Sequence, residues 1–306
     1  MYDSTPLTKK DGSPVIGLAL GSGAARGWAH IGVVQALAQH GIRPDVVCGC
    51  SIGALVGAAL VSGRIEHLGT WVKSLDWQDV VGMLDISLKG GLIRGDRVVQ
   101  HCAEHFFLSD FAKLPVPFAC VATELSTGRE VWLREGSVAD AVQASIAMPG
   151  LFSPVLRNGR VLVDGGLVNP VPVSLCRALG ADVVIAVELG SGMVGGGGRK
   201  GRKPSLLGDD HWARRLLSRI GVANEGDDGG NPALPSLPEV VTASINIMQM
   251  HIARSRLAGE PADVLISPRV AHLNMMEFDR ASEAIDEGTA AVERARPLLR
   301  HGVGLE

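Results

Sequence analysis

The sequence predicts a three-layer α/β/α fold, in which helices cover both faces of a mostly parallel β-sheet. Short apolar runs without charge alternate along the chain with longer segments of helical periodicity. Two of these apolar runs pass directly into glycine-rich turns, and each turn is followed by a helical pattern. With 306 residues, of which 46% are hydrophobic, the chain can bury a sizeable core.

The folded part of the chain begins with a predicted strand and helix. Residues 15–20 (VIGLAL) form an apolar run that is long enough for a buried strand and too short for a helix. Residues 28–40 carry apolar side chains at helical spacing, among them Ile31 and Val34, and Gly41 is a good helix stop. A strand therefore leads through a glycine-rich loop into a helix.

The next segment, residues 46–63, carries no charge over a length close to the ~20 residues of a membrane-spanning helix. It contains four glycines, however, and opens on a β-branched Val-Val pair. These features favour a buried strand over 46–49, followed by a buried helix through Leu60.

The rest of the chain continues the alternation of strands and helices. The same criteria predict further strands at 117–122, 130–133, 161–163, 182–187 and 263–266, and further helices at 138–148, 172–179, 237–257 and 280–295. We therefore expect a single domain over residues 14–300, preceded by a polar N-terminal tail at 1–13.

The segment 190–235 interrupts this pattern. It is rich in glycine and in charge, which is the composition of a flexible insertion. Within it, residues 211–220 predict a short basic amphipathic helix with Trp212, Leu216 and Ile220 on one face. The insertion is either a solvated excursion or a lid that makes transient contact with a membrane surface.

Composition and charge narrow the function. The formal net charge of −3 gives no indication of a nucleic-acid partner. Five cysteines without metal-ligand spacing indicate reduced thiols, and the polar N-terminus shows no signal peptide. We therefore expect a cytoplasmic protein, and nothing in the pattern indicates its oligomeric state.

Residues 49–53 (GCSIG) match the G-x-S-x-G pattern of a nucleophile elbow. In such a turn the serine adopts a strained backbone conformation, and Gly49 and Gly53 leave room for the strand and the helix to approach each other. The N-terminus of the helix then directs its amides and its positive dipole end toward the serine oxygen. The pattern and its strand–turn–helix context predict that Ser51 is a nucleophile.

The first glycine-rich loop (GSGAARG), from Gly21 to Gly27, also lies between a strand and a helix. Its backbone amides can bind an anionic oxygen, either of a phosphate or of the oxyanion in acyl transfer. A dinucleotide site would place an acidic residue at the end of the second strand, whereas Asp45 precedes that strand and Ser51 ends it. Acyl transfer is therefore favoured, and purely structural glycines are the alternative.

A third motif supplies a candidate base. Asp164, Gly165 and Gly166 follow the apolar run at 161–163. Taken alone, D-G-G is an ordinary turn signal. We expect this strand to end on the same edge of a parallel sheet as Ser51, which makes Asp164 the candidate partner of the serine.

In this order along the chain, the motifs at 21–27, 49–53 and 164–166 resemble those of the patatin-like phospholipase family. Residues 144–150 (ASIAMPG) resemble a further block of that family. The resemblance extends over residues 14–300, and the combination of motifs is far more specific than any one of them.

The C-terminal part narrows the resemblance to a subgroup. The segments SINIMQ (244–249) and ARSRL (253–257) are similar to small bacterial proteins akin to neuropathy target esterase, of the RssA type. One feature departs from the family pattern. The family's loop commonly has consecutive glycines, which Ser22 and Ala24 interrupt here, but the backbone amides that bind an oxyanion remain.

The resemblance implies a serine lipid acyl hydrolase that acts on phospholipids, lysophospholipids or related fatty-acyl esters, without cofactor or metal. Ser51 would attack the ester carbonyl and Asp164 would accept its proton directly, so that the two residues form a dyad in place of a triad. A carboxylate with a pKa near ~3.9 is a weak base for an alcohol. Catalysis would therefore depend on oxyanion stabilisation, for which one donor is worth roughly 3 kcal/mol.

The expected oxyanion donors are the backbone amides of Gly23 and Ala24, and the amide of Ile52 could add a third. Arg26 would either steady the loop or approach a lipid phosphate. Ser145, in the block at 144–150, is expected to be dispensable for the covalent step.

Three alternatives remain at this point. A Ser-His-Asp triad would recruit His251 or His272. His101 and His105 have the spacing of metal ligands on a helix, but no third ligand is evident, so a solvated helix face is favoured. A non-catalytic regulatory or scaffold protein could also retain this fold, although it would have no reason to keep both the serine and the aspartate.

Overall fold

The computed structural model describes residues 9, 12–83, 96–191 and 237–303. Within these residues eight strands form one sheet in the order β5-β6-β3-β2-β1-β7-β8, with β4 also paired to β3. The strands are β1 (Ile16–Leu20), β2 (Val46–Cys50), β3 (Phe118–Glu124), β4 (Glu130–Leu133), β5 (Val155–Arg157), β6 (Arg160–Asp164), β7 (Val183–Val187) and β8 (Val264–Ile266). β1, β2, β3, β7 and β8 are parallel, whereas β3 pairs antiparallel with β4 and β6, and β5 pairs antiparallel with β6.

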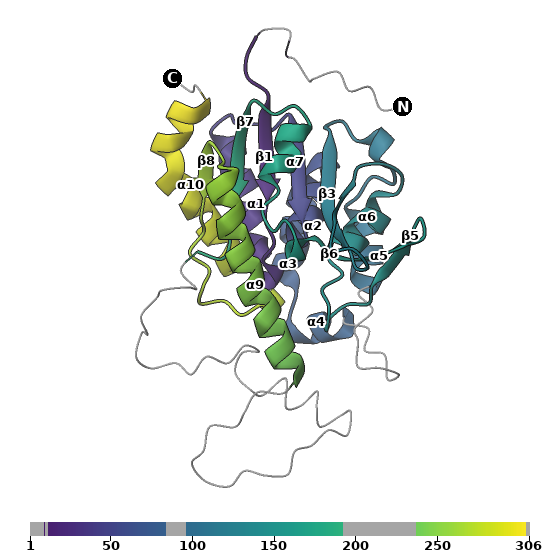
Figure 1. The fold of residues 1–306 in the computed structure, drawn as a ribbon. Helices are drawn as coiled ribbons and strands as arrows, with labels where there is room; N and C mark the ends of the chain where they lie inside the picture. The colour runs from purple at the N-terminus through teal and green to yellow at the C-terminus, as the bar shows by residue number, and fades with distance from the viewer. Residues whose placement is uncertain (1–8, 10–11, 84–95, 192–236, 304–306) are drawn as a thin grey trace.

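Helices cover both faces of this sheet. The α-helices are α1 (Ala29–Gln39), α2 (Ile52–Val61), α3 (Ile65–Ser74), α4 (Trp77–Met83), α5 (Asp96–His105), α6 (Val138–Ser145), α7 (Val173–Ala178), α9 (Leu237–Gly259) and α10 (Ala281–Val303). Short 3₁₀ turns are η1 (Ala24–Trp28), η2 (Phe111–Lys113), η3 (Gly165–Leu167) and η4 (Phe278–Arg280). In Figure 1, α7 and α9 cross the front of the sheet, while α1, α2 and α10 lie behind it.

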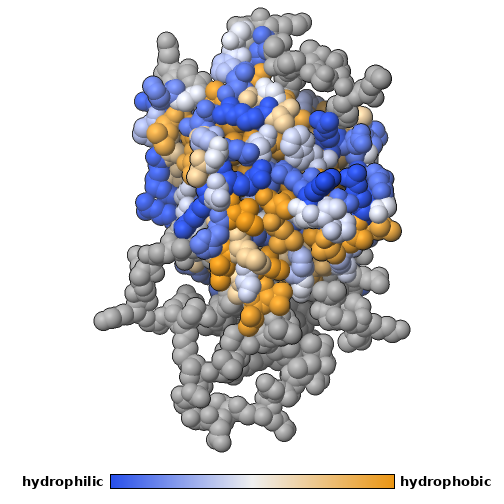
Figure 2. Space-filling view, viewed as in Figure 1, coloured by the Kyte–Doolittle hydropathy of each residue, from blue (hydrophilic) through white to orange (hydrophobic). Residues whose placement is uncertain are grey.

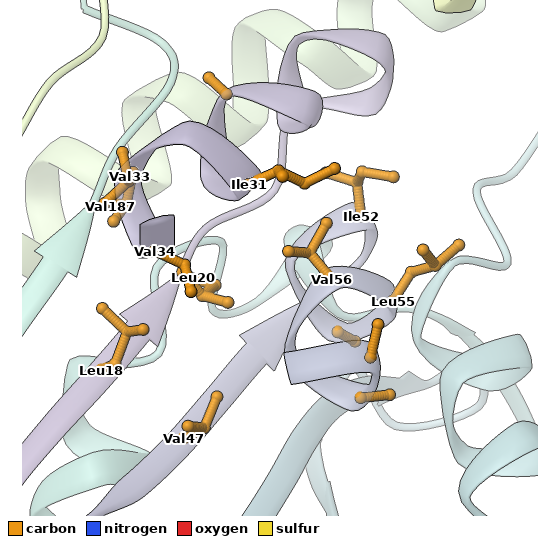
Figure 3. Close-up of a cluster of buried hydrophobic side chains, with 14 of the residues drawn as sticks. Leu18, Leu20, Ile31, Val33, Val34, Val47, Ile52, Leu55, Val56 and Val187 are labelled. Carbon is orange, nitrogen blue, oxygen red and sulfur yellow. The ribbon is translucent and has the colours of Figure 1, made fainter. Parts of the chain in front are cut away.

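Alternate side chains of the strands enter two separate cores. On β1, Leu18 and Leu20 point into the larger core with α1 and α2, whereas Ala19 belongs to the smaller core with α7. Figure 3 shows part of the larger core, where Leu18 and Leu20 lie near Val47 of β2 and Val56 of α2. Because both faces of the sheet are covered, the central strands are apolar at every position, which is why they read as continuous apolar runs.

The backbones of helices α1 and α10 approach each other closely where the two helices cross. A Cβ atom on Gly32 would lie 1.9 Å from the carbonyl oxygen of Ile285, and one on Gly288 would lie 2.0 Å from that of Ala29. Only glycine fits at these two positions. The C-terminal helix is thereby packed tightly against α1, the helix that directly follows the loop at 21–27.

The predicted three-layer α/β/α architecture is confirmed, and differences lie in the details. The helix expected at 28–40 is divided into η1 and α1, and the helix expected at 280–295 continues to Val303. Helices α3 and α4 were not predicted, and α5 contains the helix face considered for His101 and His105. Both α3 and α5 bury one face only: α3 buries Leu68 and Val72, and α5 buries Val99 and Cys102. Most of the segment 46–63 forms the buried β2 and α2, and no helix in the described part of the chain is long and apolar enough to span a membrane.

The insertion predicted at 190–235 falls, after Ser191, outside the described residues, as does the amphipathic helix predicted at 211–220. Most of the N-terminal tail at 1–13 also lies outside them. All five cysteines are described, and each is buried and free of disulfide bonds.

Candidate active site

Ser51 occupies the turn between β2 and α2 with an unusual backbone conformation. Its φ of 55° and ψ of −123° lie in a region that residues with a side chain rarely adopt. A Cβ atom on Gly49 would lie 2.5 Å from the backbone nitrogen of Ala54, and one on Gly53 would lie 2.2 Å from the carbonyl oxygen of Leu20. The two glycines are therefore required sterically, because the strand, the turn and the helix approach within backbone contact.

The Ser51 hydroxyl donates a hydrogen bond of 2.6 Å to Oδ2 of Asp164. The other oxygen, Oδ1, accepts a 2.6 Å bond from the amide of Gly166. Asp164 is fully buried, and this burial raises the pKa of its carboxyl to about 6, although the bonds from Ser51 and Gly166 oppose the shift. A Cβ atom on Gly165 would lie 2.2 Å from the carbonyl oxygen of Val121, so the turn after Asp164 needs glycine for space.

Asp164 reaches Ser51 in a different way from the one predicted. Its strand, β6, is antiparallel to β3, so the expectation that both residues end strands on one edge of a parallel sheet was wrong. The register provides the alignment instead. Val121 of β3 pairs with Cys50, the residue before Ser51, and the next residue of β3, Ala122, pairs with Asp164. The aspartate and the serine therefore lie at the same level on opposite sides of β3.

Three backbone amides anchor the loop from Gly21 to Gly27. The amides of Gly21, Ser22 and Ala25 donate to the carbonyl oxygens of Val187 (3.0 Å), Pro170 (2.8 Å) and Met275 (3.1 Å), respectively. In contrast, the amides of Gly23 and Ala24 have no acceptor among the described residues. Ala24 also has a φ of 51°, in the left-handed region. These two amides, predicted as oxyanion donors, are thus the part of the loop that remains available to a ligand.

Side chains beneath the loop hold it to α9 and α1. Arg26 is buried and donates a 3.1 Å bond to Oδ1 of Asn246, and burial lowers the pKa of its guanidinium to about 10, while the charge of Glu188 opposes this effect. The Ser22 hydroxyl donates to Oε1 of Gln249 over 3.1 Å. Of the two uses expected for Arg26, the structure supports the steadying of the loop, since its side chain points into the protein.

His30 on α1 supports the loop from a third direction. It is fully buried, and its Nε2 donates a 2.7 Å bond to the carbonyl oxygen of Gly21. Burial lowers the pKa of this histidine to about 4, so the ring is neutral near pH 7. His30, Asn246 and Gln249 were not assigned a role from the sequence. The available signal was a polar side chain in an otherwise apolar helix face, which for Asn246 and Gln249 recurs at a spacing of three residues.

An apolar pocket adjoins both motifs. It is lined by Ala24 of the loop and Ile52 of the elbow, and further by Trp28, Leu55 and Met148. The pocket thus adjoins Ala24 and the residue that follows Ser51, and its lining is apolar. The pocket therefore fits an apolar substrate chain.

Comparison with known proteins identifies the family of the chain. The sequence pattern of the patatin-like phospholipase family matches residues 18–177. An uncharacterized NTE family protein of Mycobacterium tuberculosis is 35% identical over 329 aligned positions, which cover 92% of this chain and 91% of the relative. The chain belongs to the patatin-like phospholipase family. As a member of it, the protein is a lipid ester hydrolase.

More distant relatives extend this picture. The lysophospholipase nte1 of Emericella nidulans is 32% identical to this patatin-like protein over 193 residues, which cover 58% of the chain and 12% of the relative. The crystal structure of VipD from Legionella pneumophila superimposes with a TM-score of 0.52 over 97% of this chain and 70% of that one. At 15% identity, this last likeness concerns the fold alone.

Among the described residues, no histidine forms a hydrogen bond with Ser51 or Asp164. His272 is half exposed and forms an ion pair of 2.6 Å with Glu283, and the side chain of His251 is exposed on α9. His101 stacks against Trp71, with ring centroids 4.8 Å apart. In the described part of the chain, no group of three or more histidine, cysteine or acidic side chains is placed to hold a metal ion.

Proposed function

We propose that Ser51 and Asp164 hydrolyse fatty-acyl esters of phospholipids or lysophospholipids through an acyl-enzyme. The observation that carries the proposal is the 2.6 Å hydrogen bond from the serine hydroxyl to a fully buried carboxylate. With a pKa of about 6, Asp164 is a stronger base than an ordinary carboxylate and is still mostly ionised near pH 7. The relative named as a lysophospholipase supports this substrate class.

In the acylation step, Ser51 Oγ forms a bond to the ester carbonyl carbon as its proton passes to Oδ2 of Asp164. The negative charge that develops on the carbonyl oxygen is stabilised by the amides of Gly23 and Ala24. The amide of Ile52, the first residue of α2, adds the positive end of that helix. The tetrahedral intermediate then breaks its bond to the alcohol oxygen, which leaves with the proton held by Asp164.

In the deacylation step, water takes the place of the alcohol. Asp164 accepts a proton from this water as its oxygen attacks the acyl carbon, and the same amides stabilise the second oxyanion. The bond between the acyl carbon and Ser51 Oγ breaks, and the proton returns to the serine. The fatty acid is released and both residues regain their starting states.

The surface beside the site suits a lipid substrate that resides in a membrane. Figure 2 shows apolar side chains gathered over the lower part of α9. Val240, Val241, Ile247 and Met248 are exposed there, and Val241 lies within 3.4 Å of the position of a Cβ on Gly150, close in sequence to the pocket. We infer that this face makes transient contact with a membrane surface while a lipid enters the pocket.

A serine-reactive probe and a lipid panel test the proposal together. Purified protein is treated with a fluorophosphonate and separately assayed on phospholipids, lysophospholipids and a short soluble ester. We expect a covalent adduct on Ser51 by mass spectrometry, hydrolysis of at least one lipid class, and loss of both in Ser51→Ala. The matched control is Ser62→Ala, which removes a serine hydroxyl at the C-terminal end of α2 that is bonded to the amide of Leu108, whereas Ser51 precedes the N-terminal end of that helix. Full activity in Ser51→Ala, or no adduct and no hydrolysis in the wild type, would overturn the proposal; the second result would favour a scaffold role.

A further inference from the structure

Ser145, the last residue of α6, makes two hydrogen bonds that the mechanism above does not use. Its side chain is completely buried. Its hydroxyl oxygen accepts a 3.0 Å bond from the backbone amide of Ser51, and the hydroxyl donates a 2.7 Å bond to the carbonyl oxygen of Val121. A single hydroxyl group thus joins the nucleophile's backbone to β3, the strand that separates Ser51 from Asp164.

The same segment also holds the aspartate. Two residues after Ser145, the carbonyl oxygen of Ala147 accepts a 2.9 Å bond from the backbone amide of Asp164. On the other side, the hydroxyl of Thr123 donates a 2.8 Å bond to the carbonyl oxygen of Asp164. The end of α6 therefore contacts the backbone of both members of the dyad.

Two features of the site make such a contact necessary. The backbone of Ser51 has a φ of 55°, a conformation that costs about 1–3 kcal/mol and persists only where surrounding contacts enforce it. In addition, β2 and β6 are not neighbours in the sheet, because β3 lies between them. β-sheet hydrogen bonds therefore align the serine and the aspartate only through β3, and no ladder joins their two strands directly.

We propose that Ser145 is a positioning residue, whose hydroxyl holds the nucleophile elbow so that Ser51 Oγ stays within hydrogen-bond distance of Asp164. Its own hydroxyl remains intact throughout the reaction, so no bond to Ser145 forms or breaks. This inference rests on the proposed function for its kinetic consequences. It adds a role for the block at 144–150 that does not involve the covalent step.

The loss of this contact has a consequence that a general loss of stability would not produce. The hydrogen bond from Ser51 lowers the pKa of Asp164, against the larger effect of burial. Beyond Ser51, the Gly166 amide also lowers the pKa of this carboxyl. Burial and then the charge of Asp164 raise the pKa of the Cys50 thiol well above its ordinary value, so this thiol stays neutral. If the elbow moves away, the pKa of Asp164 rises. The acid limb of the pH–rate profile is the range in which activity rises with pH as Asp164 becomes ionised. This limb then moves to higher pH.

The test compares Ser145→Ala with Ser145→Thr, which retains a hydroxyl, and with the control Ser62→Ala. Each variant is assayed from pH 4 to 9 on a short soluble ester and for its rate of labelling by a fluorophosphonate. For Ser145→Ala we expect kcat and the labelling rate to fall by about 10- to 100-fold with little change in KM, because small misplacements of reacting groups have effects of this size. We also expect the acid limb of the pH–rate profile of Ser145→Ala to move to higher pH. Ser145→Thr should restore both kcat and the position of the acid limb, and Ser62→Ala should change neither.

Unchanged kcat and an unchanged acid limb in a folded Ser145→Ala would overturn the proposal. If Ser145→Ala does not fold, Ser145→Cys, which keeps nearly the same volume with a weaker hydrogen-bonding group, is expected to show the same changes in smaller measure. Hydrogen exchange at the Ser51 amide separates this inference from the proposed function. Even if the wild type hydrolyses none of the esters tested, that amide should exchange faster in Ser145→Ala than in Ser62→Ala, and equal exchange would refute the role.

Discussion

The half of the site that carries Ser51 and Asp164 is built within the sheet and α6, whereas the half formed by residues 21–27 depends on segments far along the chain. Ser51 bonds to residues 94 and 113 positions away, and these partners lie within the region matched by the family pattern. The loop residues Ser22 and Arg26 bond to partners on α9 that are 227 and 220 positions away, outside that region. The proposed nucleophile and base are thus positioned by the central sheet and the end of α6, while the side chains of Ser22 and Arg26 in the loop are held by α9.

This difference predicts which substitutions should lower activity and which should lower stability. A change in the proposed dyad should remove a reacting group but leave the tertiary structure in place. A change in an anchor of the loop leaves every reacting group present but weakens contacts that also stabilise the fold. The predictions below separate these two kinds of effect.

The largest effect is expected from Asp164→Asn. Removal of the general base should lower kcat on a short soluble ester by about 10²- to 10⁴-fold, the usual contribution of such a group. The fold should become more stable at the same time. The folded-state pKa of Asp164, about 6, lies above its ordinary value of 3.8, so the folded chain binds more protons than the unfolded chain between these two pH values. The contribution of Asp164 to stability therefore falls as pH rises through this window and stays low above it.

Asparagine carries no charge to bury, so the free energy of unfolding of Asp164→Asn should exceed that of the wild type at pH 8. The difference should reach at most about 3 kcal/mol and should shrink near pH 4. Thermal unfolding at the two pH values measures it. The control is Asp279→Asn at an exposed carboxylate, which should alter neither activity nor stability appreciably. A variant that retains most of its activity would show that Asp164 is not the base.

The sequence predicted the dyad half better than the loop half, for physical reasons that particular residues illustrate. The pairing of Ser51 with Asp164 could be predicted because a strained turn and a close approach leave local signatures, namely the glycines at 49, 53, 165 and 166. The direction of β6 was predicted wrongly, because an apolar run does not reveal whether its strand is parallel or antiparallel. Asn246, Gln249 and His30 had no assigned role, since a buried polar side chain cannot be matched with a partner 220 residues away before the fold is known.

An intermediate effect is expected from Asn246→Leu, which removes the acceptor of the 3.1 Å bond from Arg26 at nearly constant side-chain volume. Because that bond involves a buried charged group, we expect a loss of about 1–3 kcal/mol in stability. The loop at 21–27 should loosen, and kcat should fall by about 3- to 10-fold, in line with a partial loss of oxyanion stabilisation. Urea unfolding and steady-state kinetics measure the two quantities.

The acid limb of the rate profile distinguishes this variant from a change in the dyad. In Asn246→Leu it should stay near pH 6, since neither Ser51 nor Asp164 is displaced. Ile247→Ala, at the adjacent and half-exposed position on α9, is the matched control and should preserve both stability and kcat. A wild-type stability and rate in Asn246→Leu would mean that α9 does not hold the loop.

The smallest effect is expected from His272→Ala, and it decides between a dyad and a triad. The ion pair of His272 with Glu283 has both side chains about half exposed, and surface pairs of this kind contribute at most about 1 kcal/mol. The histidine should therefore be dispensable for hydrolysis. We expect kcat within about two-fold of the wild-type value and the acid limb of the pH–rate profile within a few tenths of a pH unit of the wild-type position. His251→Ala, at an exposed position on α9, should behave in the same way.

The measurement is the pH–rate profile from pH 4 to 9 for both variants beside Asp164→Asn. If a folded His272→Ala were as inactive as Asp164→Asn, the direct 2.6 Å contact between Ser51 and Asp164 would not be the catalytic arrangement, and a Ser-His-Asp triad would have to replace it.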